Sequence, residues 1–161
     1  LTSNGAGALP TFQAASGTWT TVLKPSDETV TSDTIVTADT DLQFSMAAST
    51  NYRIRLKIFY VTTGTADFRL SITGPASPTR VHIARWHISA GDSTFSSVTN
   101  LTSYPSNAQL PGSGTNGFIY MDCVIQNGAN AGTFSFDWAQ ATSSANPTGV
   151  EEGSSLEYAV I

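Results

Sequence analysis

The stretch Asn51–Val61, NYRIRLKIFYV, alternates its side chains with a period of two along its whole length. One parity is apolar throughout, and it holds Tyr52, Ile54, Leu56, Ile58 and Tyr60. The other parity carries Arg53, Arg55, Lys57 and Phe59. Because successive side chains of a β-strand point to opposite faces of its sheet, this pattern is typical of a strand with one face in a core. The stretch therefore predicts a long, half-buried strand.

Similar runs of β-branched and aromatic residues, separated by turn-forming residues, occur on both sides of this stretch. We predict further strands at residues 18–23, 29–36, 41–46, 66–73, 80–88, 117–126, 132–141 and 154–161. No sustained helical period accompanies them. The sequence thus predicts an all-β fold, an antiparallel β-sandwich of jelly-roll-like form.

The predicted strands 117–126 and 132–141 are joined by residues 127–131, NGANA. Asn and Gly accept the positive φ angles that tight reversals need, so we expect these two strands to form a β-hairpin. Residues 89–115 are polar and rich in Gly and Pro, which predicts a long loop between strands.

In the predicted strand 80–88 the apolar residues change parity. Val81 and Ile83 share one face, whereas Trp86 and Ile88 share the other. A β-bulge or a bend near Ala84 would bring all four side chains to the same face, so we expect one of the two there.

The chain of 161 residues has the length of one domain. Residues 1–17 contain Asn4-Gly5, Gly7 and Pro10 and few apolar side chains, which predicts an extended connector or arm before a β-sandwich domain at 18–161. Position 1 is leucine, so we expect that the chain was cleaved or continues a longer polypeptide.

Only 12% of the residues are charged, and the formal net charge is -5. Binding to nucleic acid by counterion release needs a stripe of Lys and Arg, so this composition argues against a nucleic-acid partner. Arg53, Arg55 and Lys57 form at most a local basic ridge, which we interpret as a solvated or subunit-facing strand face. No apolar run approaches the ~20 residues of a membrane span, and we expect no membrane insertion.

The sequence offers few groups for nucleophilic or metal chemistry. The histidines His82 and His87 are five positions apart on one predicted strand, so they point to opposite faces and were expected at the surface or at an interface. The single cysteine, Cys123, lies in an apolar run and is interpreted as a buried hydrophobe. We predict no catalytic residue, no metal ligand and no cofactor, while a Ca²⁺ ion held by a loop stays open.

Glycoside hydrolysis is the enzymatic alternative, because it needs only two carboxyl groups roughly 5 to 10 Å apart. The pairs Asp27/Glu28, Asp39/Asp41 and Glu151/Glu152 lie in or beside predicted turns, where acids usually cap the turn. Asp122 and Asp137 instead lie within predicted strands, so a polysaccharide depolymerase would use them or another acid pair. The interpretation we favour is that both lie on a polar strand face or are bonded across a subunit contact.

Contacts with a receptor would come from loops. Aromatic rings that stack on sugars, with amides around them, are typical of carbohydrate binding. We predict receptor-binding residues in the long loop and at the tip of the expected hairpin: Tyr104, Asn107, Gln109, Asn127 and Asn130.

The opening residues 1–13, LTSNGAGALPTFQ, resemble a segment that recurs in bacteriophage tail-fibre and virion-surface proteins, where it joins a fibrous stem to a terminal globular domain. The remainder is similar to the β-sandwich modules at the ends of such proteins, through residues 73–79 (TGPASPT), 127–133 (NGANAGT), 138–140 (WAQ) and 153–158 (GSSLEY). The resemblance implies a jelly-roll-like, trimeric domain on the virion surface, with no catalytic residues. Similar modules occur in head fibres and capsid decoration proteins.

Our leading hypothesis is a non-enzymatic virion structural protein, a trimeric fibre or spike tip domain that mediates host-surface attachment from the extracellular particle. Its expected partners are two further copies of the chain, other virion proteins of the fibre stem, tail or capsid, and a host-surface glycan or protein receptor. The alternative is a capsid decoration (cement) protein that stabilises the phage head. A polysaccharide depolymerase is the third hypothesis.

Overall fold

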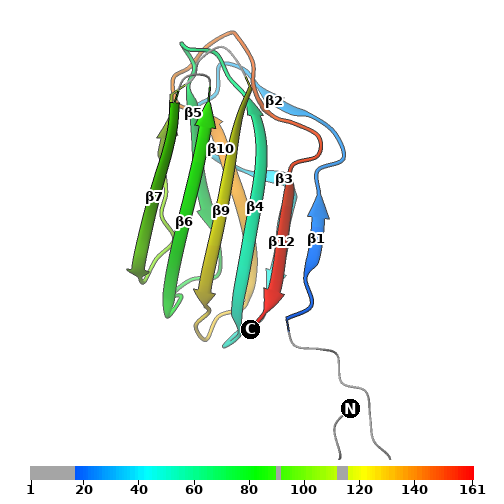
Figure 1. Cartoon of the computed structure of the whole chain (residues 1–161), viewed down its shortest axis with the longest axis vertical. Coiled ribbons are helices and arrows are strands. Elements are labelled where there is room, and N and C mark those ends of the chain that lie inside the picture. The colour runs from blue at the N-terminus through cyan, green and yellow to red at the C-terminus, as the bar shows by residue number, and fades with distance from the viewer. Residues whose placement is uncertain (1–16, 90–91, 112–115) are drawn as a thin grey trace, which may run out of the picture.

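The computed structural model describes residues 17–89, 92–111 and 116–161, which form two packed antiparallel sheets (Figure 1). The described residues contain no helix, and hence no helix that could cross a membrane. The strands are β1 (Thr20–Leu23), β2 (Glu28–Val30), β3 (Thr37–Met46), β4 (Asn51–Val61), β5 (Phe68–Thr73), β6 (Arg80–Ser89), β7 (Asp92–Leu101), β8 (Ala108–Leu110), β9 (Asn116–Gln126), β10 (Gly132–Gln140), β11 (Thr148–Val150) and β12 (Ser155–Val160).

Eight of these strands have the connectivity of a jelly roll. β1, β12, β4 and β9 are neighbours in the larger sheet, and β3, β10, β5 and β8 make up the smaller one. The hairpin β6–β7 lies between β5 and β8 in the chain and extends the larger sheet beyond β9. β2 and β11 form a short pair beside β4. The predicted antiparallel, jelly-roll-like sandwich is therefore confirmed, with β6–β7 as an addition to it.

The core lies between the two sheets and is built as the alternation of β4 predicts. The parity Tyr52 to Tyr60 is buried, whereas Arg53 and Phe59 on the other parity are exposed. β4 occupies the middle of the larger sheet, paired along its whole length with β9 and over most of it with β12. Its buried face meets the aromatic face of β10, which supplies Phe134, Phe136 and Trp138, and Cys123 is fully buried as predicted.

The predicted strand 51–61 has the same bounds as β4, but other predictions were wrong. The predicted strand 29–36 is not one strand, because β2 ends at Val30 and β3 begins at Thr37. The predicted loop 89–115 contains β7 and β8. β7 reads DSTFSSVTNL, a Ser- and Thr-rich segment that pairs with β6 at the edge of the sheet, so tertiary pairing rather than an apolar face decides its structure.

The predicted hairpin 117–126/132–141 is also wrong. β9 pairs with β4 and β6, whereas β10 pairs with β3 and β5 in the other sheet. Residues 127–131 therefore cross from one sheet to the other. β9 and β10 each have an apolar face, and both faces belong to one core cluster. The two strands bury these faces against each other when they lie in opposite sheets, which neighbouring strands of one sheet cannot do.

No bulge interrupts β6 near Ala84. β6 pairs with β9 in continuous register from Arg80 to Ile88, and the only register shift of β6 is against β7, between Val81 and Ile83. β6 keeps its alternation, so Trp86 and Ile88 point outward and are 55% and 50% exposed. The apolar residues change face because the outer surface itself becomes apolar there.

One end of the sandwich collects the start of β1, the end of β12 and the crossing at 127–131. Thr20 pairs with Tyr158, and Asn51 pairs with Gln126, which precedes the crossing. Figure 1 marks the C-terminus at this end, which we call the terminal end; the opposite end is the distal end. The predicted connector lies outside the described residues, except for Gly17.

Candidate functional site

The residues predicted to contact a receptor differ in their exposure. Asn107, Gln109 and Asn130 are exposed, whereas Asn127 is buried and Tyr104 is half-buried. Gln109 lies opposite Arg69 near the distal end of β5, while the Asn130 Nδ2 donates to the carbonyl of Ala76, beyond the other end of that strand. The structure therefore spreads the exposed residues along one side of the sandwich and does not bring them together in one site.

The Tyr104 ring lies at the edge of the core. It makes an edge-on contact with Phe134, at 6.4 Å between ring centroids. A Cβ atom at Gly74 would overlap the ring, so the glycine makes room for it. Burial raises the pKa of Tyr104 to about 12. A ring packed in this way offers little surface on which a sugar could stack.

Asn127 holds the crossing between the two sheets. Its Nδ2 donates to the carbonyls of Ala47, at 2.7 Å, and Asn130, at 2.9 Å. The backbone supports the same connection, because the Ser49 N–H donates to the carbonyl of Gly128 at 2.7 Å. The Asn-Gly pair thus serves a turn, as predicted, but the turn joins two sheets.

The carboxylates considered for glycoside hydrolysis lie on opposite outer faces. Asp122 points outward from the larger sheet and binds Arg53 through two hydrogen bonds of 2.7 and 3.1 Å. Asp137 lies on the outer side of the smaller sheet and accepts hydrogen bonds from Thr73 and Ser135. With the core between them, the two carboxylates cannot line one groove.

The histidines point to opposite faces of β6, as predicted, but the expectation of two surface side chains fails for one of them. His87 is buried, and its Nε2 lies 2.6 Å from the Tyr60 hydroxyl. His82 is half-buried on the outer face. Cys123 is fully buried, and burial followed by the charge of Asp122 raises the pKa of its thiol to about 12.

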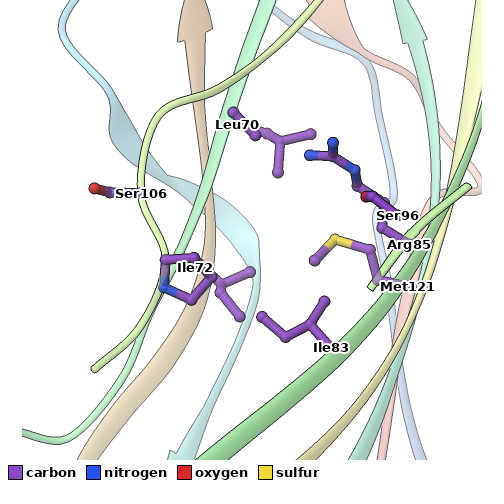
Figure 2. A pocket seen from close by; sticks show the side chains of 9 residues that line it. Leu70, Ile72, Ile83, Arg85, Ser96, Ser106 and Met121 are labelled. Carbon is purple, nitrogen blue, oxygen red and sulfur yellow. The ribbon is translucent and has the colours of Figure 1, made fainter. Parts of the chain in front are cut away.

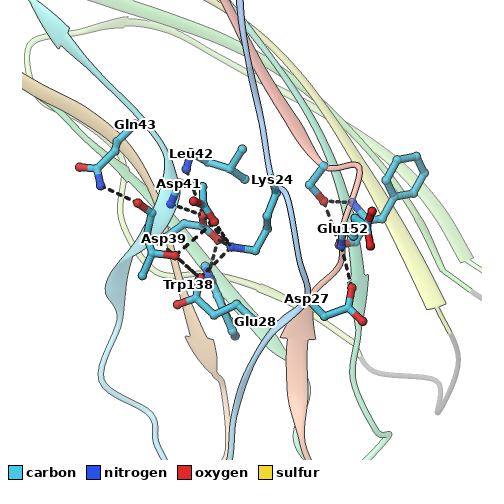
Figure 3. Close-up of polar contacts among 12 residues, drawn as sticks. Lys24, Asp27, Glu28, Asp39, Asp41, Leu42, Gln43, Trp138 and Glu152 are labelled. Carbon is cyan, nitrogen blue, oxygen red and sulfur yellow. Dashed lines mark hydrogen bonds and ion pairs between the residues drawn. The ribbon is translucent and has the colours of Figure 1, made fainter.

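Three carboxylates gather around one ammonium group where β1 ends (Figure 3). The Lys24 Nζ lies 2.7 Å from Glu28, 3.0 Å from Asp39 and 3.2 Å from Asp41. Asp39 is fully buried and also accepts a hydrogen bond of 3.0 Å from the Nε1–H of Trp138. From the sequence, these acids were predicted only to cap turns. Lys24 meets Asp39 and Asp41, which are 15 and 17 positions away, only when the chain is folded.

The acidic oxygens of this Lys24 cluster lie within 4.8 Å of one another, a spacing that would suit a cation. The Lys24 ammonium is that cation. Burial by itself lowers the pKa of Lys24, but its hydrogen bonds to Glu28 and Asp39 outweigh burial and raise it. For Glu28 the directions are reversed. Burial alone raises the pKa of Glu28, but the hydrogen bonds from Lys24 and Thr40 outweigh burial, so the pKa is lowered. The cluster is a charge-compensated structural site.

The most exposed apolar surface lies on the outer face of the larger sheet. There, side chains of β4, β9, β6 and β7 form what we call the aromatic patch: Phe59, Trp86, Ile88, Phe95, Phe118 and Tyr120. Phe95 is 60% exposed and contacts the 55% exposed Trp86 edge-on, at 5.4 Å between centroids. Phe59 packs against Phe118 at 5.2 Å. Contiguous exposed apolar surface of this kind is typical of protein–protein contacts.

The patch continues to one edge of the larger sheet. β7 is ten residues long and forms one edge of the larger sheet. Natural edge strands usually carry Lys or Pro, or are very short, to prevent pairing with another chain. β7 contains neither Lys nor Pro, whereas β1 at the other edge has four residues. Among the described residues no strand pairs with the outer edge of β7, so the β6–β7 hairpin presents an apolar face beside a sheet edge.

No protein-family model matches this chain, and no curated protein matches it.

Proposed function

We propose that this chain is a non-catalytic structural module of a bacteriophage particle, which forms a homotrimer at the tip of a fibre or spike and contributes to host attachment. The aromatic patch beside the β7 edge is the observation that carries this proposal. It gives the module a surface suited to another protein chain, and a second copy of the same chain is the partner we propose.

Two features favour a partner that is another copy. The chain has few charges, so a homotrimer would cover apolar surface without leaving charged groups unpaired. Trp86, Ile88 and Phe95 of the patch lie, with the edge, on a hairpin that the eight-stranded jelly roll does not need for its own connectivity. Burying Phe95 and Trp86 between subunits would contribute about 25 cal/mol for each Å² of apolar area removed from water.

The attachment role is supported by the resemblance of residues 1–13 to the segment that precedes terminal domains of phage fibres. The non-catalytic role is supported by the separation of Asp122 from Asp137 on opposite outer faces and by the complete burial of Cys123. Asn107, Gln109 and Asn130 stay as proposed receptor contacts because they are exposed.

The oligomeric state tests the proposal directly. Light scattering after size exclusion should give a trimer for the wild-type chain at micromolar concentration, and a monomer for the double variant Trp86→Ser/Phe95→Ser. Ile35→Ser removes an even more exposed apolar side chain from a distal loop, and this variant should stay trimeric. A folded wild-type monomer would contradict the trimer, and a trimeric double variant would exclude the aromatic patch as its interface.

The place on the particle tests the attachment role separately. Cryo-electron microscopy of the intact particle should locate trimers at the far end of a fibre or spike. Trimers seated on capsid symmetry axes would instead mean a cement role and would overturn the proposal of host attachment.

A further inference from the structure

A cavity of about 220 Å³ opens between the two sheets on the side where β7 and β8 form their edges (Figure 2). Leu70 and Ile72 line it from the smaller sheet, and Ile83 and Met121 line it from the larger one. Its wall is mainly aliphatic. Arg85 of β6 is the one charged side chain among the lining residues.

Arg85 points inward because β6 keeps its alternation up to Ser89. In Figure 2 its side chain reaches from the larger sheet toward Leu70 of the smaller sheet. Burial lowers the pKa of this guanidinium, which nevertheless remains charged at neutral pH. Among the described residues, no carboxylate forms an ion pair with it.

Two other arginines show the contrast, because both have partners. Arg53 binds Asp122, and Arg69 donates to the carbonyls of Thr34 and Ala141. Arg85 is half-buried, so its guanidinium has lost part of its hydration, and no anion among the described residues compensates for that loss. The cost of desolvating the guanidinium is part of the folding free energy. A carboxylate that binds Arg85 therefore does not bear this cost again, which favours binding.

We propose that this cavity binds a small aliphatic carboxylate, with the carboxylate on the Arg85 guanidinium and the hydrocarbon tail against Leu70, Ile72, Ile83 and Met121. Ser96 of β7 pairs with Arg85 and lines the same cavity, so its hydroxyl could donate a second hydrogen bond to the carboxylate. This inference goes beyond the proposed function and does not depend on the trimer or on the virion.

The size and the lining define the ligand class. The cavity volume is below the ~300–1,000 Å³ of pockets for drug-sized ligands, so a short aliphatic tail is the size that fits. A sugar acid would need hydrogen-bond partners for several hydroxyl groups. Besides Arg85, the side chains that could supply them are Ser96 and Ser106 alone among the lining residues, so an aliphatic tail is favoured over a sugar ring.

Calorimetric titration of the full chain with hexanoate tests the proposal. We expect one hexanoate per chain, with shifts of the Ile83 and Met121 methyl resonances in the corresponding NMR titration. Arg85→Met should weaken binding about 10- to 100-fold, because it removes a charge-assisted hydrogen bond and keeps an unbranched apolar side chain. Hexanol, which has the same tail without the charge, should bind the wild-type chain correspondingly more weakly.

Arg80→Gln is the matched control, because Arg80 lies on the same strand but is exposed, and it should leave hexanoate binding unchanged. Arg85→Lys keeps the positive charge and should retain part of the affinity, which separates lost charge from a fold that fails. The proposal is overturned if hexanoate at about 10 mM, a concentration at which even a weak millimolar affinity is detected, does not bind. Equal binding by Arg85→Met would overturn it too, and equal binding of glucuronate would replace the aliphatic ligand with a sugar acid.

Discussion

Replacing Lys24 with methionine should lower the free energy of unfolding by about 3–5 kcal/mol, the range measured when one partner of a buried ion pair is removed. Lys24 is 1% exposed and Asp39 is fully buried, so solvent cannot take over the role of the ammonium. Methionine preserves much of the aliphatic volume. The loss would therefore report the uncompensated negative charge of Glu28, Asp39 and Asp41 rather than a cavity.

Urea denaturation followed by circular dichroism, at pH 7 and near pH 4, measures this effect. The deficit of the variant should shrink at the lower pH, because protonation of a carboxylate removes like-charge repulsion within the cluster. Lys57→Met is the matched control: its ion pair with Glu157, at 3.3 Å, is partly exposed to solvent and should be worth less than about 1 kcal/mol. If Lys24→Met costs no more than Lys57→Met, the cluster does not stabilise the fold as argued.

Three further predictions follow from the contacts. Asn127→Ala should cost about 1–2 kcal/mol in urea denaturation, because the carbonyl of Ala47 loses its amide donor; no loss would mean that the backbone alone holds the crossing. The lowered pKa of Glu28 contributes stability above its unfolded value of 4.5, so thermal denaturation should show this stability disappearing as the pH falls below 4.5, and a Glu28→Gln variant should show a weaker acid dependence. The thiol of Cys123 should resist iodoacetamide in the native chain and react in urea, and rapid alkylation of the folded chain would contradict its burial.

Several parts of the fold followed from local patterns. The strand Asn51–Val61 was predicted with its observed bounds, because its alternation is complete and one face is wholly apolar. The burial of Cys123 followed from its apolar neighbours for the same reason. In such segments every second residue must be apolar because it faces the core, so the alternation can be recognised in the sequence alone.

The candidate sites were harder to predict because their parts come from distant segments. Lys24 and Asp39 are fifteen positions apart, and no local pattern pairs them. The change of apolar parity in β6 was visible, but a bulge and an exposed aromatic patch explain it equally well from the sequence. Only the register with β9 distinguishes the two, and it shows that Trp86 and Ile88 face outward.

The sequence by itself determined the class of the fold and which residues face the core in the strongly alternating strands, since a period of two depends only on the geometry of an extended chain. Only the tertiary structure decided which strands are neighbours. It placed β9 and β10 in different sheets and made the polar β7 an edge strand. It also directed the Arg85 side chain toward an apolar cavity between the sheets. The physical reason is that hydrogen-bond pairing and packing across the core are contacts between remote segments, and their balance is reached only when the whole chain is assembled.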